Sequence, residues 1–544
     1  MKFRIPAIAA LLLVCLSCVD SDYKLGGSLI PVDQTYSIYS TELPIPEVRA
    51  EIPDSLSGFS STRITIGAVR DEEFGLSTRS CVLTLVPIND TLDFGKNPVV
   101  RRFHFAAALD TISTASDEYA NILQNVRVYE LEDRVDPDTQ FDCNGDIPHG
   151  TRRITRGSPI LNGTDSLSFD FSLEYANKYL GITDADLADI DVYLEKFPGI
   201  YITTDEPAGI GGRINAFDLQ LSYNSSYYYL EGNYAHLDIT STYDGERKDT
   251  TFYFYYSPLD IIPSDSLLTT YSTGKFPQYA LNLTHHETRG RAGAAEAVIP
   301  VEGGGGLKPM IKAKTLIALA REMIEAKGAN PEGVVINKAT IVLPFEFPED
   351  YRDMKRYPYL LSPTCRFHSS DTTISFIGLT DSSNEDEDQG DIDRANLEFS
   401  PDITYHLQEL LKIKDSDATK KKRLDNGSYD IWFLILANEV VSSSTSTETQ
   451  NDMSEYYKYL AYQSYYSSMY GYGGYGGYGG YGSSYSNYYT YMMMAQYYNN
   501  SGTTAQTTTV MDKDRYYRGW LNGPKASGRV PTLQLTFSVP NSAQ

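Results

Sequence analysis

Cysteine is scarce in this chain of 544 residues, which contains five. So few thiols exclude a fold that depends on several disulfide bonds, as many small secreted domains do. Three of them, Cys81, Cys143 and Cys365, lie far apart and none belongs to a Cys-x-x-Cys pair, which argues against a structural zinc site. We expect these three to be buried structural residues that form at most one disulfide bond.

Basic residues are also in short supply. The 46 lysines and arginines face 71 aspartates and glutamates, which gives a net charge of -25. This excess of negative charge repels the phosphates of nucleic acids and of anionic lipid headgroups, so we expect no nucleic-acid partner. Beyond the first residues, the chain also lacks an apolar run of the roughly 20 residues that a transmembrane helix needs.

The motifs of common enzyme classes are missing as well. None of the seven histidines stands in a His-Glu-x-x-His motif. The glycine run at residues 303–306 precedes Lys308 without the Gly-Lys-Ser/Thr ending of a phosphate-binding loop. Among 71 acidic residues no carboxylate pair stands out for glycoside hydrolysis. The sequence therefore assigns no catalytic residue, and a carbohydrate-active hydrolase on a β scaffold is the alternative to a non-enzymatic function.

Residues 1–18 have the layout of a bacterial export signal. Lys2 and Arg4 supply a positive start, residues 7–16 form a short apolar run, and the small Ser17 stands directly before Cys18. We expect a lipoprotein signal peptide that ends at a lipidated Cys18, whose acyl chains attach the protein to a membrane. Secretion with a chance cysteine is the alternative.

Short segments that alternate apolar and polar residues recur along the whole chain. Examples lie at residues 63–66, 81–86, 126–129, 252–255 and 431–436. A period of two with β-branched and aromatic residues is typical of strands that are buried on one face. We therefore predict a mainly β protein with two β-sandwich or jelly-roll-like domains. A few connecting helices are predicted at residues 184–197, 312–327 and 403–414.

The length of the chain favours two or three domains. We expect a tether at residues 19–45, an N-terminal β-sandwich domain at 46–300 and a C-terminal β domain at 301–544. The C-terminal domain contains the helix at 312–327 and a Tyr/Gly-rich insertion at 442–511. The four glycines at 303–306 are interpreted as a hinge near the boundary.

The Tyr/Gly-rich insertion is the most unusual part of the sequence. Residues 453–498 hold 17 of the 44 tyrosines, and Gly-Gly-Tyr repeats run through its centre. Tyrosine offers a large contact area and glycine allows adaptation, a combination found in binding loops. We expect the insertion to project from one end of a sheet and to contact a partner or glycan through Tyr472, Tyr475, Tyr478 and Tyr481. A low-complexity loop without a ligand and a self-association element are the alternatives.

One cluster of oxygen-bearing side chains resembles a calcium loop. Asp138, Asp142, Asn144 and Asp146 surround a predicted Asn144-Gly145 turn, and calcium prefers such ligands. The spacing of a twelve-residue calcium loop and its closing glutamate are absent, so an ordinary polar turn is the alternative. Elsewhere, His285 and Glu287 would share one face of a strand while His286 points away.

A short motif recurs more often than composition explains. Asp followed by Ser or Thr and then a small or aliphatic residue resembles the O-glycosylation motif of exported Bacteroidota proteins, and glycans there would add bulky, solubilising surface. Ordinary strand-edge sequence is the alternative. The candidate hydroxyls are Ser55, Thr91, Thr111, Ser166, Thr250, Ser266 and Thr372.

Four stretches resemble a family of Bacteroidota outer-membrane lipoproteins classed as a domain of unknown function. They are residues 27–31 (GSLIP), residues 66–75 with Asp71, Phe74 and Gly75, residues 126–131 (VRVYEL) and residues 336–339. The acidic residues directly after Cys18 also resemble the surface-export signals of such lipoproteins. The resemblance implies an outer-membrane location, with the cell surface favoured over the periplasmic face, and a β architecture. It implies no activity. The leading hypothesis is a lipid-anchored envelope protein that binds a glycan or protein partner or is a subunit of an envelope assembly.

Overall fold

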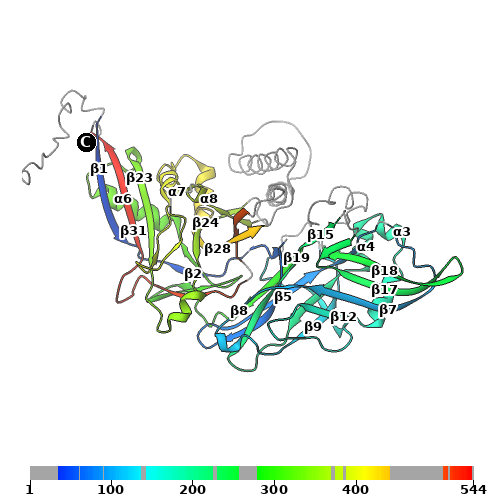
Figure 1. Ribbon diagram of the computed structural model, residues 1–544. Coiled ribbons are helices and arrows are strands. Elements are labelled where there is room, and N and C mark those ends of the chain that lie inside the picture. Colours follow the sequence, from blue (N-terminus) through cyan, green and yellow to red (C-terminus); the bar gives the residue numbers. More distant parts are fainter. Residues whose placement is uncertain are drawn as a thin grey trace, which may run out of the picture.

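The computed structural model describes residues 35–541 except 55, 61, 90, 136–141, 225–228, 257–277, 369–373, 384–387, 442–505 and 513–514. Strands in antiparallel sheets dominate these residues, which confirms the predicted mainly β class. Figure 1 shows two lobes side by side. Among the described residues, none of the helices has the length and apolar character needed to cross a bilayer.

The N-lobe, residues 59–286, is built from two sheets. The larger sheet contains β3 (Phe59–Ser60), β4 (Arg63–Asp71), β5 (Gly75–Leu83), β8 (Leu109–Thr114), β9 (Gln124–Leu131), β10 (His149–Arg153), β11 (Ile160–Leu161), β13 (Ile200–Thr204), β14 (Gly211–Asp218) and β19 (Ala280–His286). The smaller sheet contains β6 (Leu85–Pro87), β7 (Lys96–Ala107), β12 (Leu167–Asp170), β17 (Ala235–Tyr243) and β18 (Glu246–Tyr256). A hairpin and four short helices complete the lobe: β15 (Leu221–Asn224), β16 (Tyr229–Gly232), η3 (Asp117–Tyr119), α2 (Leu173–Tyr179), α3 (Asp184–Leu187) and α4 (Ile190–Lys196).

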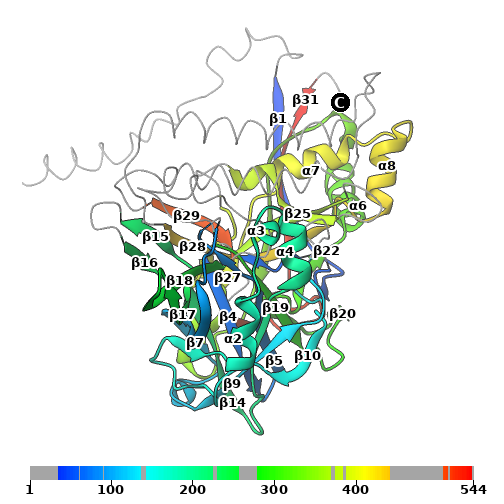
Figure 2. The same ribbon diagram turned by 90° about the vertical axis from the view of Figure 1, so that its right-hand side faces the viewer.

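The core of the N-lobe lies between its two sheets, as in a β-sandwich. Ile66 and Leu83 of the larger sheet and Phe105 and Leu237 of the smaller sheet belong to one buried cluster. The predicted strand at residues 81–86 is divided at Thr84, because β5 belongs to the larger sheet and β6 to the smaller one. In Figure 2, which looks onto the N-lobe, α2, α3 and α4 lie on the near side.

The C-lobe, residues 36–51 and 293–540, contains two larger sheets and one strand pair. The five-stranded sheet is formed by β1 (Tyr36–Pro44), β31 (Thr532–Pro540), β23 (Val335–Pro344), β27 (Glu398–Phe399) and β26 (Ile392–Asp393). The seven-stranded sheet is formed by β20 (Gly293–Ala294), β2 (Arg49–Glu51), β22 (Lys308–Ile311), β28 (Ile431–Val441), β24 (Leu360–His368), β25 (Ile374–Gly378) and β29 (Gln506–Met511). The remaining elements are β21 (Val298–Glu302) paired with β30 (Arg518–Asn522), the helices α6 (Ala313–Glu325), α7 (Thr404–Leu411) and α8 (Ala418–Asp425), and the 3-10 helices η4 (Pro331–Gly333), η5 (Tyr351–Arg356) and η6 (Thr380–Ser383).

The helices at 312–327 and 403–414 appear where the sequence predicts them. The apolar face of α6 is buried, with Leu316, Ala320 and Ile324 fully covered, and Leu407 of α7 joins the same core. The helix predicted at 184–197 is instead divided into α3 and α4, because the side chain of Asp189 caps the start of α4 by accepting a hydrogen bond from the backbone of Asp191.

The domain boundaries differ from the predicted ones at the start of the chain. Residues 36–44, expected in the tether, form β1 and pair with β31 from Tyr36 opposite Pro540 to Pro44 opposite Thr532. The next strand, β2, pairs with β20 and β22 in the same lobe. The chain therefore starts in the C-lobe, crosses to the N-lobe and returns. The local pattern of residues 36–44 is weak because both faces of β1 are partly exposed.

Candidate binding site between the lobes

The β4–β5 turn of the N-lobe, residues 71–75, packs on β30 of the C-lobe. The rings of Phe74 and Trp520 lie with centroids 4.7 Å apart, and the indole nitrogen of Trp520 donates to Glu73 at 2.8 Å. Asp71 is 3 % exposed and forms an ion pair with Arg518 at 3.1 Å. One carboxylate oxygen of Asp71 also accepts hydrogen bonds from the backbone N–H groups of Glu73 and Phe74. The turn is therefore held in one shape while it joins the lobes.

A second cation strengthens this contact. The guanidinium of Arg291 lies over the ring of Phe74 at 5.0 Å and over that of Trp520 at 5.4 Å. Such cation–π contacts stabilise by about 0.5–2 kcal/mol, more when water is excluded. Asp71 and Phe74 are residues of the stretch that resembles the lipoprotein family, and their place in the structure is this interlobe contact.

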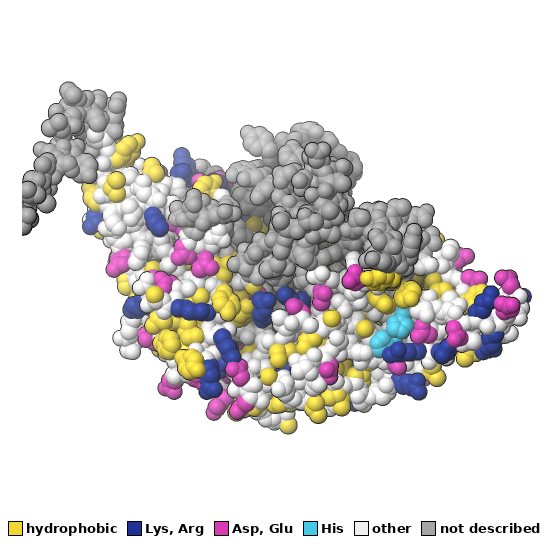
Figure 3. Space-filling model, in the orientation of Figure 1, with side chains coloured by type: hydrophobic (Ala, Val, Ile, Leu, Met, Phe, Trp, Pro, Cys, Tyr) yellow, Lys and Arg dark blue, Asp and Glu magenta, His cyan; other side chains and the backbone are white. Residues whose placement is uncertain are grey.

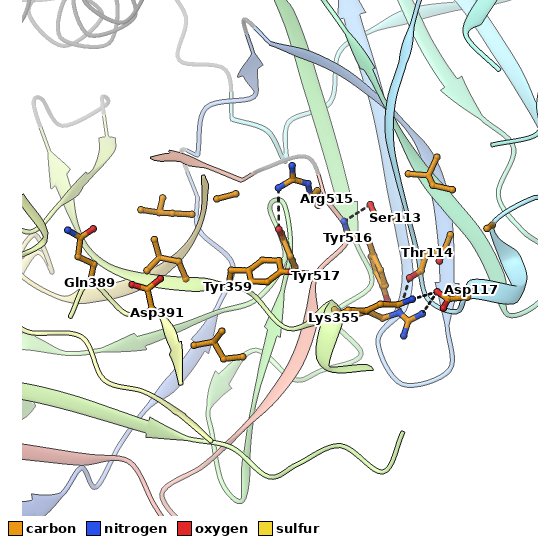
Figure 4. Close-up of a pocket in the computed structure, with 17 residues that line it drawn as sticks. Ser113, Thr114, Asp117, Lys355, Tyr359, Gln389, Asp391, Arg515, Tyr516 and Tyr517 are labelled. Atoms are coloured by element: carbon orange, nitrogen blue, oxygen red, sulfur yellow. Dashed lines mark hydrogen bonds and ion pairs between the residues drawn. The ribbon is translucent and has the colours of Figure 1, made fainter. Parts of the chain in front are cut away.

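A cavity of about 1060 Å³ opens beside the contact, and both lobes supply its walls. Figure 4 shows its lining side chains. The N-lobe contributes β8 and η3, and the C-lobe contributes η5, β24, β28 and the segment before β30. The lining residues are Ile112, Ser113, Thr114, Asp117, Ala120, Lys355, Arg356, Tyr359, Leu360, Gln389, Asp391, Ile392, Leu436, Ala437, Arg515, Tyr516 and Tyr517.

One end of the cavity is closed by charged residues that connect the lobes. Asp117 of η3 forms ion pairs with Lys355 and with Arg356, the latter at 3.5 Å. The hydrogen bond from Lys355 holds the pKa of Asp117 below its usual value, so this carboxylate stays ionised. Arg356 also donates to the backbone oxygen of Thr114 at 3.0 Å. These groups fix the relative position of η3 and η5 across the cavity.

The other end carries an exposed aromatic ring. Tyr359 is 51 % exposed, and the guanidinium of Arg394 lies 5.4 Å from the centre of its ring. Gln389 and Asp391 line the same end (Figure 4). Tyr517 in the floor of the cavity is held in place, because its hydroxyl donates to the buried carboxylate of Asp512 at 2.9 Å. An aromatic ring beside amide and carboxylate groups can hold a polar, ring-shaped ligand.

The strand that precedes the Tyr/Gly-rich segment forms part of the wall of this cavity. Leu436 and Ala437 of β28 line the cavity, and β28 pairs with β29 from Leu436 opposite Met511 to Val441 opposite Gln506. Val441 and Gln506, which flank residues 442–505, are therefore paired side by side in the seven-stranded sheet. Residues 506–511, expected inside the insertion, belong to β29. Tyr472, Tyr475, Tyr478 and Tyr481 lie outside the described residues.

The glycine run at 303–306, interpreted from the sequence as a hinge, is packed inside the protein. All four glycines are buried, and a Cβ added to Gly305 would lie 2.1 Å from the side-chain oxygen of Asn144. The ammonium of Lys308 donates to the backbone oxygens of Glu302, Gly304 and Gly306, the last two at 2.9 Å. Burial lowers the pKa of Lys308 to about 7. The loop is therefore packed around the Lys308 side chain at the place where the sequence was interpreted as a hinge.

Two N-lobe residues, His286 and Arg79, form a buried charged cluster with Glu302 and Lys308. His286 of β19 has a side chain that is 4 % exposed, and its Nδ1 lies 3.7 Å from a carboxylate oxygen of Glu302. Its Nε2 lies 3.1 Å from a guanidinium nitrogen of the fully buried Arg79. Burial lowers the pKa of His286 and raises that of Glu302. As expected from strand alternation, His286 points inward while His285 and Glu287 are exposed. Sequence reasoning missed this cluster because only the tertiary contact of two lobes assembles it.

Of the predicted calcium ligands, the structure describes Asp142, Asn144 and Asp146. Asp138 lies outside the described residues, and Asp142 accepts a hydrogen bond from the backbone of Asn144 at 3.0 Å. The amide of Asn144 is itself engaged by Pro53 and Thr284. In the described part of the chain, no group of three or more His, Cys, Asp or Glu side chains could hold a metal ion. The side chains of Asp142 and Asn144 therefore form hydrogen bonds that hold this loop in place.

The structure describes some of the remaining predicted residues and not others. Of the O-glycosylation candidates, Thr91 and Ser166 are exposed and Thr111 and Thr250 are partly exposed. The lipidation candidate Cys18 and three hydroxyl candidates lie outside the described residues; these hydroxyls belong to Ser55, Ser266 and Thr372. Of the cysteines expected to be structural, Cys81 and Cys143 are buried and Cys365 is partly buried, and none of these three forms a disulfide bond.

Comparisons of the chain with models of protein families, with curated proteins and with solved structures find no match. The functional assignment therefore depends on the sequence features and the geometry described above.

Proposed function

We propose that this protein is a lipid-anchored outer-membrane protein that binds a glycan in the cavity between its lobes. The observation that carries the proposal is the exposed ring of Tyr359 in a cavity of about 1060 Å³, beside Gln389 and Asp391. Sugar rings stack on aromatic side chains through their C–H faces, and amide and carboxylate groups pair with their hydroxyls. The volume lies at the upper end of the range for small-molecule sites, which leaves room for several sugar rings.

The position of β1 supports an arrangement in which the cavity faces away from the membrane. Residues 19–35 connect Cys18 to β1 and reach at most about 60 Å when fully extended. The start of β1 lies at the end of the C-lobe that is remote from the N-lobe (Figure 1). A lipid on Cys18 would therefore keep the C-lobe within about 60 Å of the membrane and leave the N-lobe and the cavity accessible to an extracellular ligand.

The hydrolase alternative needs two carboxylates about 5–9 Å apart that face one cleft. The two carboxylates that line the cavity, Asp117 and Asp391, lie at opposite ends of it in Figure 4. Asp117 is also engaged by Lys355 and Arg356. This arrangement favours binding over hydrolysis.

The proposal is tested with purified protein on an array of bacterial and host glycans. We expect binding by the wild type and at least about tenfold weaker binding by Tyr359→Ala, because the variant loses the stacking surface. The matched control is Tyr253→Ala, which removes an exposed tyrosine (38 % exposed) from the N-lobe. Equal binding by the two variants, or no binding of any glycan by the wild type, would contradict the glycan assignment.

The lipid anchor is tested separately in cells. Radiolabelled palmitate should be incorporated into the wild type and not into Cys18→Ala, which has lost the acceptor thiol. Exposure to protease added outside intact cells then reports on the cell surface. Label that persists in Cys18→Ala would show that the anchor lies elsewhere.

A further inference from the structure

A second concavity, of about 400 Å³, opens on the outer face of the larger N-lobe sheet. Its floor is formed by Thr78 and Ser80 of β5 and by His285 of β19, with His285 directly opposite Thr78 in the strand register. Its walls are Tyr201 of β13 and the loop of residues 145–149. This face is opposite the sandwich core, since Cys81 and Leu83 point into the core while Val82 packs in a separate cluster.

The loop over this pocket is held firmly at its base. The backbone of Cys143 donates to Leu56 and accepts from Thr284, both at 2.6 Å. The side chain of Asn144 donates to the backbone oxygen of Pro53 at 3.3 Å and accepts from the hydroxyl of Thr284 at 3.1 Å. The loop therefore presents Asp146 to the pocket from a fixed base. Asn144, chosen from the sequence as a calcium ligand, holds the loop instead.

The aromatic wall is fixed in the same way. The ring of His149 stacks on Tyr201 with centroids 4.1 Å apart and on Tyr129 with centroids 5.0 Å apart, nearly parallel in both cases. Burial raises the pKa of Tyr201, and the negative charge of Asp146 raises it further. The Tyr201 hydroxyl therefore stays protonated and able to donate. Little side-chain entropy would be lost when a ligand contacts groups that are already ordered.

The chemistry of the lining narrows the class of ligand. The lining residues supply the hydroxyls of Thr78, Ser80 and Tyr201, two imidazoles and the carboxylate of Asp146. No lysine or arginine is among them. Because the pocket contains this carboxylate and no lysine or arginine to balance its charge, we expect anionic ligands to be disfavoured. Alternating donors and acceptors, with the apolar Ile147 and Leu283 beside them, match a ring that carries several hydroxyls and a C–H face. The volume falls within the range of small-molecule sites.

We propose that this pocket is a binding site for a single neutral sugar residue, separate from the interlobe cavity. Asp146 and the imidazole of His285 accept and donate hydrogen bonds to its hydroxyls, and Ser80 and Thr78 bind it from the floor. The proposal does not depend on the interlobe site, because no residue lines both. A glycan bound between the lobes and a sugar bound here would give the protein two separate points of contact.

The test is saturation-transfer NMR on the full chain with glucose, galactose, mannose and N-acetylglucosamine, each as the free monosaccharide. We expect at least one of them to bind, and at least about tenfold weaker binding in Asp146→Ala and in His285→Ala, since each removes a direct hydrogen-bond partner. Both side chains belong to exposed residues, so folding should be retained. Asp415→Ala is the matched control, because Asp415 is a fully exposed aspartate on the C-lobe.

Three outcomes would overturn the proposal. The first is that none of the four monosaccharides binds. The second is that Asp146→Ala and His285→Ala both bind like the control. The third is that binding is lost in Tyr359→Ala and kept in Asp146→Ala, which would assign the sugar to the interlobe cavity and support the proposed function while removing this site.

Discussion

Phe74 and Trp520 come from different lobes, and their rings lie 4.7 Å apart with the guanidinium of Arg291 over both. Asp71, in the same turn as Phe74, forms an ion pair with Arg518 in the same strand as Trp520. The contact combines aromatic packing, a cation–π pair and a nearly buried charge pair in one small area. Since the interlobe cavity is next to it, the geometry of the cavity depends on this contact.

We predict that Trp520→Ala destabilises the contact between the two lobes. The variant loses the ring contact with Phe74 and the hydrogen bond to Glu73, so the free energy of unfolding should fall by roughly 2–3 kcal/mol. Differential scanning calorimetry should show a lower transition temperature and a broader or divided transition. Tyr351→Ala, which removes a 73 % exposed aromatic ring from the C-lobe, should leave the thermogram nearly unchanged. An unchanged thermogram for Trp520→Ala would contradict the role of this contact.

Replacing the buried Lys308 should lower the free energy of unfolding. Lys308→Met keeps the apolar stem but removes the donors to three backbone oxygens, which are then left buried without a partner. We expect a loss of about 3 kcal/mol or more in urea unfolding experiments. The control is Lys312→Met, because the side chain of Lys312 is 46 % exposed and its ion pair with Glu47 should contribute little. Equal stability of the two variants would show that the Lys308 hydrogen bonds do not stabilise the fold.

The glycine run gives a prediction that separates a packed loop from a hinge. In Gly305→Ala the new methyl group would meet Asn144 at 2.1 Å and Thr284 at 2.5 Å, so the loop must shift at a cost of about 1–3 kcal/mol. In Gly333→Ala no atom lies within 4 Å of the added carbon, and stability should stay the same or rise slightly. Chemical denaturation measures both. A Gly305→Ala variant as stable as the wild type would show that this loop is not tightly packed.

The buried side chain of His406 leads to a prediction of how the free energy of unfolding depends on pH. Burial in α7 lowers its pKa to about 4, from an ordinary value of 6.5, and its Nε2 lies 3.1 Å from the backbone oxygen of Tyr429. Between pH 6.5 and 4 the unfolded chain therefore binds more protons at this residue than the folded chain, so acidification destabilises the fold by up to roughly 3 kcal/mol.

The readout is a comparison of urea unfolding at pH 7, pH 5.5 and pH 4.5 for the wild type and His406→Gln. Glutamine does not titrate and keeps a side-chain donor. Carboxylates titrate in both proteins, so the difference between the two curves isolates the histidine. We expect the variant to lose less stability than the wild type on acidification. Parallel curves would show that His406 is not held in its neutral form.

The pattern of local residues was enough to predict several of the elements but not the geometry of the two pockets. The alternation at residues 63–66 and 431–436 predicted β4 and β28, and the apolar face of residues 312–327 predicted α6, because burial of one face leaves a period in the sequence. The same alternation separated His285 from His286. No local pattern indicated that Asp146 would line a pocket or that Lys308 would be enclosed.

The sequence alone therefore determined the mainly β class, several of the strands, two of the helices, and the expectation of an exported, lipid-anchored protein, since each of these depends on residues that are close together in the chain. Only the tertiary structure decided that β1 pairs with β31, that the glycine loop encloses Lys308, and that the two lobes share one cavity. These features depend on strand register and on side-chain contacts between distant segments, and a period of two is compatible with many registers.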